Sequence, residues 1–81
     1  MRTKTLNELG SGEGGTITRI NGGVGMVNRL AAMDIRPGSI ITKLNSGLMN
    51  GPVTIEVNRT QIAIGFGMAT RILVEVEDSD Q

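Results

Sequence analysis

The 81 residues of this chain are enough for one small domain, which buries only about 60% of its unfolded surface. The sequence has no Cys and no His, so disulfides and thiolate or imidazole metal ligands are excluded, and apolar burial must supply the stability. Its formal net charge is zero, which gives no strong bias toward nucleic acid or an anionic membrane surface.

The N-terminal part predicts turns and one strand. Twelve glycines lie mostly at 10–15, 22–25 and 65–67, and such clusters are typical of turns between short elements. After the first cluster, β-branched residues at 16–20 predict a strand whose imperfect alternation indicates a bulge. Leu6 and Leu9, which precede the glycines, are expected to cover the core.

A single helix is predicted over residues 24–34. Met26, Leu30 and Met33 recur at spacings of four and three, which places them on one apolar helix face. Pro37 disfavours helical geometry at the residue before it, so the helix must end by about Asp34. Asp adopts the left-handed conformation more readily than most residues, which suits this stop.

The remaining chain predicts four more strands. In residues 40–45, Ile40, Thr42 and Leu44 share one face, and residues 53–57 show the clearest alternation of apolar and polar side chains. Residues 61–64 and 72–76 complete the set, with a tight turn at 58–60 and a helical turn near 66–69. The fold class is therefore mostly β, a small partly open barrel of about five strands with one short helix.

We expect residues 1–76 to form the domain and residues 77–81 to form an acidic, disordered tail. Four of the eight acidic residues lie in the last seven positions. The first 74 residues therefore carry eight basic and four acidic side chains. No apolar run is long enough to span a membrane, and no secretion signal is visible, so the expected location is the cytoplasm.

Several activities are disfavoured by the residue content. Glycines at 10, 12 and 15 match a dinucleotide-binding pattern, but a strand follows them where that site needs a helix. Without His, Cys or paired acids outside the tail, the sequence offers no catalytic group, no metal site and no need for a cofactor. Phe66 is the only aromatic residue, whereas small barrels that bind nucleic acid stack bases on several.

One family resemblance spans residues 6–76. The matching segments are Arg29-Leu30, Met33 to Gly38, Gly51-Pro52-Val53, Gln61 to Ile64 with Ala69, and Ile72 to Val76. In this order they resemble FeoA, the ferrous iron transport protein A family, whose members are similar to SH3-like barrels. The family usually has Gly at the positions of Asp34 and of the Asn58-Arg59 turn, so this chain departs from it there.

The resemblance implies a cytoplasmic, non-catalytic accessory protein of bacterial ferrous iron uptake that binds the membrane transporter FeoB. Two alternatives stay open at this stage. The same barrel resembles the metal-responsive C-terminal domain of DtxR-type iron-dependent repressors, although the DNA-binding region of those proteins is absent from this sequence. The other alternative is a small barrel that binds nucleic acid, which salt-dependent binding to oligonucleotides would reveal.

Five residues are candidates for binding the partner. Leu48 and Met49 lie in a polar loop bounded by glycines, where they either form an exposed docking tip or fold back over the open end of the barrel. Arg29 and Arg36 flank the helix end, where they complement its dipole or meet acidic groups of a partner. Phe66 either plugs the barrel end or serves as an exposed anchor.

Overall fold

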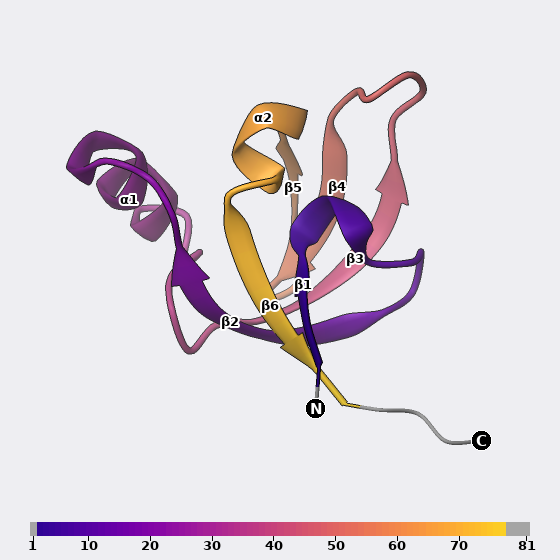
Figure 1. The fold of residues 1–81 in the computed structure, drawn as a ribbon, viewed down its shortest axis with the longest axis horizontal. Helices are drawn as coiled ribbons and strands as arrows, with labels where there is room; N and C mark the ends of the chain where they lie inside the picture. Colours follow the sequence, from indigo (N-terminus) through magenta and orange to yellow (C-terminus); the bar gives the residue numbers. More distant parts are fainter. Residues whose placement is uncertain (1, 78–81) are drawn as a thin grey trace.

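The structure, a computed structural model, describes residues 2–77. The expected acidic tail lies outside the described residues from position 78 onward. The elements in chain order are β1 (Arg2–Thr5), η1 (Leu6–Glu8), β2 (Gly14–Ile20), α1 (Val24–Ala31), β3 (Ile40–Ser46), β4 (Val53–Val57), β5 (Thr60–Ile64), α2 (Phe66–Ala69) and β6 (Ile72–Val76) (Figure 1).

The strands form one antiparallel sheet in the order β1-β6-β2-β3-β4-β5. It wraps around a common core but does not close, since β1 and β5 are the two edges (Figure 1). The predicted mostly β, partly open barrel is thereby confirmed, with one strand more than expected. That strand is β1, which reads Arg-Thr-Lys-Thr and lacks the apolar alternation that identifies strands from sequence.

The core consists of apolar side chains from almost every element. Strands β4 and β6 each bury every second residue, as their alternation predicts. Leu6 and Leu9 are also buried, in agreement with their expected role. The full set of buried apolar residues is Leu6, Leu9, Ile17, Leu30, Ile35, Ile41, Val53, Ile55, Val57, Ile64, Ala69, Ile72, Val74 and Val76.

In strand β3, the face that packs on the core is not the one that carries Ile40, Thr42 and Leu44. Ile41 and Lys43 are buried, whereas Ile40 is 73% exposed. A register shift between Lys43 and Asn45 interrupts the pairing with β4. Lys43 can face the core, against the expected alternation, because its Nζ donates hydrogen bonds to backbone carbonyls inside the fold.

The α1 helix ends at Ala31, three residues before the predicted limit, and Asp34 in the following turn adopts the predicted left-handed conformation. Asp34 has φ 65°, and its N–H donates to Ala31 O at 2.9 Å. The N–H of Ile35 donates to Leu30 O, also at 2.9 Å, and both of these side chains are buried. This pair of bonds with its apolar contact is a Schellman motif.

The β4–β5 hairpin turns through Asn58 and Arg59, with φ values of 51° and 65°. Two successive left-handed residues define a type I′ turn, which matches the twist of the strands. The Asn58 amide also donates to the Asp34 carboxylate, with Nδ2 to Oδ2 at 3.1 Å. This hydrogen bond joins the β4–β5 turn to the turn that follows α1.

Strand β2 passes very close to β6. The predicted bulge is present as a register shift between Ile17 and Arg19. Near the start of the strand, a Cβ on Gly15 would lie 2.5 Å from Glu75 O and 2.6 Å from Val74 Cγ1. Only glycine allows this approach of the two backbones.

Candidate protein-docking site

The β3–β4 hairpin projects beyond the body of the sheet (Figure 1). Two exposed apolar side chains lie at its end. Leu48 is 90% exposed and Met49 is 97% exposed. The Gly51 N–H donates to Leu48 O at 3.0 Å, and Met49 and Asn50 have φ values of 53° and 64°. These values define a type I′ turn. We call Leu48 and Met49 the hairpin tip.

The hairpin tip has a conformational cost. A left-handed conformation costs a residue with a Cβ about 1–2 kcal/mol, and Met49 gains little packing in return because it is almost fully exposed. Of the two alternatives for this loop, folding back over the barrel end is excluded by the same exposure. An exposed apolar pair on a strained turn makes the hairpin tip a candidate for binding.

A hollow of about 240 Å³ lies at the foot of the hairpin. The hairpin lines one side of it, and Asn7 of η1 and Phe66 of α2 also contribute. Phe66 is half-buried, so it is neither a complete plug of the barrel end nor a free anchor. Phe66 and the hairpin therefore border one continuous surface, although they are distant in sequence.

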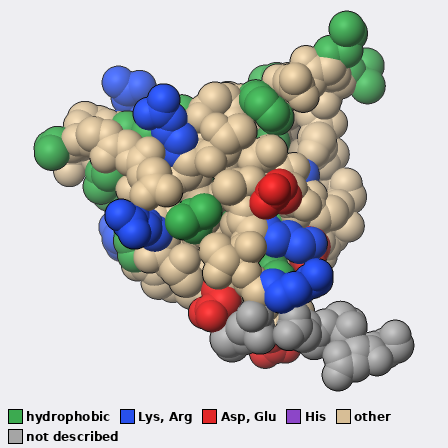
Figure 2. Space-filling view, viewed as in Figure 1, with side chains coloured by type: hydrophobic (Ala, Val, Ile, Leu, Met, Phe, Trp, Pro, Cys, Tyr) green, Lys and Arg blue, Asp and Glu red, His purple; other side chains and the backbone are tan. Residues whose placement is uncertain are grey.

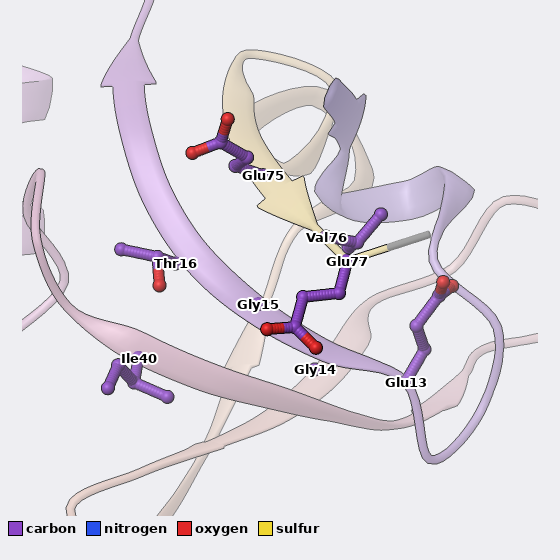
Figure 3. A pocket seen from close by; sticks show the side chains of 8 residues that line it. All are labelled: Glu13, Gly14, Gly15, Thr16, Ile40, Glu75, Val76 and Glu77. Carbon is purple, nitrogen blue, oxygen red and sulfur yellow. The ribbon is translucent and has the colours of Figure 1, made fainter. Parts of the chain in front are cut away.

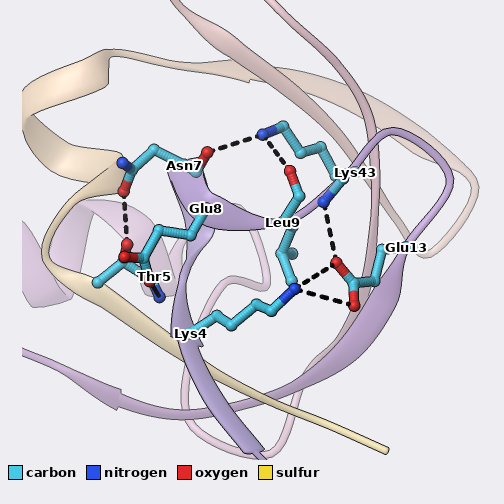
Figure 4. Close-up of polar contacts among 8 residues, drawn as sticks. Lys4, Thr5, Asn7, Glu8, Leu9, Glu13 and Lys43 are labelled. Carbon is cyan, nitrogen blue, oxygen red and sulfur yellow. Dashed lines mark hydrogen bonds and ion pairs between the residues drawn. The ribbon is translucent and has the colours of Figure 1, made fainter. Parts of the chain in front are cut away.

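A buried lysine joins η1 to the base of the hairpin. Lys43 of β3 is 2% exposed, and its Nζ donates to Asn7 O at 2.9 Å and to Leu9 O (Figure 4). Burial lowers the pKa of Lys43, and the nearby Glu13 carboxylate partly opposes that change. No sequence pattern indicates this arrangement, because a lysine within a strand is expected to face solvent.

Glu13 holds the loop between η1 and β2 beside this lysine. Its carboxylate accepts the Gly10 N–H at 2.9 Å and lies 3.2 Å from Lys4 Nζ (Figure 4). The Gly10 hydrogen bond, followed by the Lys4 contact, lowers the pKa of Glu13. The Lys43 N–H donates to Glu13 O at 2.9 Å, so the loop is fixed to β3 through backbone as well.

The two arginines lie apart from the hairpin tip. Arg36 donates to Ala31 O at 3.3 Å and to Asp34 Oδ1 at 3.4 Å, so its guanidinium supports the end of α1. Arg29 is exposed on α1. In Figure 1, α1 and the β3–β4 hairpin lie at opposite ends of the long axis, and Figure 2 shows basic side chains near α1 and apolar ones at the projecting hairpin.

A second hollow, of about 430 Å³, lies between β2 and the end of β6. Glu13, Glu75 and Glu77 surround it, and Ile40 stands at its border (Figure 3). Within residues 2–77, no group of three or more His, Cys, Asp or Glu side chains is arranged to hold a metal ion. The same residues include no helix long and apolar enough to cross a membrane.

The fold is that of a small mostly β protein of the SH3-like type. The FeoA domain model matches residues 4–76. A putative Fe(2+) transport protein A of Methanocaldococcus jannaschii is 39% identical over 64 residues, which cover 79% of this chain and 76% of that protein. This chain therefore belongs to the FeoA family of ferrous iron transport accessory proteins.

Solved structures agree with this assignment. The crystal structure of an iron uptake regulatory protein, FeoA, is 35% identical, has a TM-score of 0.83, and is matched over 93% of this chain and 97% of its own. A manganese-dependent transcriptional repressor also reaches a TM-score of 0.83, at 21% identity over 93% of this chain and 42% of its own. At that identity, the likeness to the repressor shows a shared fold alone.

Proposed function

We propose that this protein acts in the cytoplasm by binding the cytoplasmic part of a FeoB-type ferrous iron transporter, without catalysing a reaction itself. Membership of the FeoA family supports the setting in iron uptake. The observation that carries the proposal is the hairpin tip, where Leu48 and Met49 are almost fully exposed on a strained turn.

The hairpin tip and the hollow beneath it form a surface of two parts. Leu48 and Met49 supply apolar side chains that a partner can enclose, and Phe66 lies beside the backbone of the hairpin in the hollow. Interfaces obtain most of their binding free energy from a few side chains at the centre of the contact. We assign the docking role to these three residues, and Arg29 and Arg36 would form a separate contact with acidic groups.

The test is the affinity of two double variants for a soluble cytoplasmic domain of FeoB. Burial of one large apolar side chain contributes about 1.5–3 kcal/mol, so Leu48→Ser with Met49→Ser should weaken binding at least tenfold. The matched control is Val24→Ser with Ile40→Ser, because these side chains are 77% and 73% exposed elsewhere on the surface. Equal affinities of the two variants, both folded, would exclude the hairpin tip as the docking site.

A further inference from the structure

The outer edge of β5 is a strand edge without a neighbour. β5 pairs with β4 through residues 60–64 without a register shift, and it is the last strand of the sheet. Thr60, Gln61 and Ala63 are exposed. An uncovered, regular strand edge is a template for pairing with another strand.

The turn geometry shows which backbone groups this edge presents. In a hairpin with a two-residue loop, the residues that flank the loop exchange both hydrogen bonds, and bonded pairs then alternate along the strands. Val57 and Thr60 flank the loop, so Thr60, Ile62 and Ile64 bond to β4. The N–H and C=O groups of Gln61 and Ala63 therefore point outward. In the described part of the chain, no hydrogen bond to them is found on that side.

The two edges of the sheet differ in their protection against such pairing. The β1 edge carries the charged residues Arg2 and Lys4, and charge on an edge strand discourages association. The β5 edge reads Thr-Gln-Ile-Ala-Ile, with no charge and no proline. Nothing in the β5 strand itself opposes the approach of a second strand.

We propose that β5 is a self-association edge, which pairs antiparallel with β5 of a second copy of this chain. A two-fold axis at Ile62 places Gln61 opposite Ala63 of the second copy, and Ala63 opposite its Gln61. These are the two residues whose backbone groups point outward, so the same alignment forms four hydrogen bonds between the strands. The edge is thus complementary to itself without a shift of register.

The dimer is weak and leaves the docking surface accessible. A stable interface buries about 1,600 Å² in total, and one pair of five-residue strands supplies much less, so the dissociation constant should be on the order of 100 µM to 1 mM. The hairpin tip lies toward the Val53–Ile64 end of the β4–β5 pair. Because the pairing is antiparallel, the two hairpin tips would lie at opposite ends of the joined sheet.

The test is sedimentation equilibrium of the full chain from about 20 µM to about 2 mM, a range that brackets the expected constant. The average mass should rise from 8.6 kDa toward twice that value. Ala63→Pro removes an outward N–H without breaking the β4–β5 pairing, and should weaken the dimer at least tenfold. Ala63→Val is the matched control, because it keeps the N–H, and its constant should stay within about threefold.

A second measurement on the unsubstituted chain covers the case in which Ala63→Pro fails to fold. Amide hydrogen exchange at Gln61 and Ala63 should slow about two- to fivefold between the lowest and highest protein concentrations, in proportion to the fall in the monomer fraction, while amides of the β1 edge stay unchanged. A monomeric mass over the whole range, exchange at these amides that is independent of concentration, or an unaltered dimer of a folded Ala63→Pro would each overturn the proposal.

Discussion

Replacement of Lys43 by methionine tests the structural basis of the docking surface. Lys43 is buried, and its Nζ donates to the carbonyls of Asn7 and Leu9. Methionine fills the space of the lysine stem but offers no donor to either oxygen. The change therefore removes the side-chain hydrogen bonds between η1 and β3, the strand that leads into the β3–β4 hairpin, and keeps most of the apolar contact.

The magnitude follows from two opposing contributions. Two hydrogen bonds from a charged donor contribute about 1.5–3 kcal/mol each, so their loss alone would cost about 3–6 kcal/mol. Methionine also avoids the cost of burying an ammonium group, which offsets several kcal/mol of this loss. We expect a net loss of about 1–3 kcal/mol from a total of about 4–12 kcal/mol for a domain of this size.

Urea unfolding monitored by circular dichroism measures the loss, and the melting temperature should fall by roughly 5–20 °C. Lys4→Met is the control. Its ion pair with Glu13 joins side chains that are 26% and 29% exposed, so that change should cost at most about 1 kcal/mol. A Lys43→Met variant as stable as the unsubstituted chain would refute the idea that this lysine holds η1 in place.

The pH dependence of the free energy of unfolding, compared between the unsubstituted chain and Lys43→Met, gives an independent check. Burial lowers the pKa of Lys43 below its ordinary value of 10.5. Between the lowered pKa and 10.5, the unfolded chain binds more protons than the folded one at this site, so the contribution of Lys43 to stability rises with pH. The free energy of unfolding lost in Lys43→Met should therefore grow as the pH approaches 10.5, and a loss that shrinks would contradict this sign.

Three further changes test other parts of the fold. Gly15→Ala should cost at least about 2 kcal/mol in urea unfolding, because its Cβ would lie 2.5 Å from Glu75 O; a cost below about 0.5 kcal/mol would refute this close approach. Met49→Gly relieves a left-handed residue at φ 53°, so stability should rise by up to about 1 kcal/mol while affinity for the FeoB domain falls; a parallel loss of both would speak against a strained docking turn. Asp34→Gly and Asn58→Gly should show a coupling energy of about 0.5–1 kcal/mol in a double-mutant cycle, since their side chains are hydrogen-bonded, and additive effects would contradict that link.

Elements were predicted correctly where the local sequence pattern and the tertiary packing favour the same structure. The left-handed conformation of Asp34 and the alternation in β4 and β6 are confirmed, because left-handed propensity and side-chain period act over a few residues. The predicted helix extended three residues too far, since Met33 continues the apolar pattern while the backbone has already entered the turn.

The remaining features depend on contacts between distant residues. β1 is a strand because it pairs with β6, and no pattern within Arg2–Thr5 shows this. Lys43 faces inward because carbonyl oxygens 34 and 36 positions away accept hydrogen bonds from its Nζ. The polar, glycine-bounded loop marks Leu48 and Met49 as candidates from sequence but leaves their exposure open. The position of Phe66 beside the same hollow depends on the three-dimensional fold.

The most direct test of the docking proposal is a titration of isotope-labelled protein with the soluble cytoplasmic domain of a FeoB from the same source. Resonances of Leu48, Met49 and Phe66 should shift locally and saturate, and those of Arg29 and Arg36 report on the other end of the molecule. Saturable shifts centred on the hairpin tip are the predicted result. Unchanged spectra at high micromolar FeoB domain, or shifts confined to α1, would contradict the proposed docking surface.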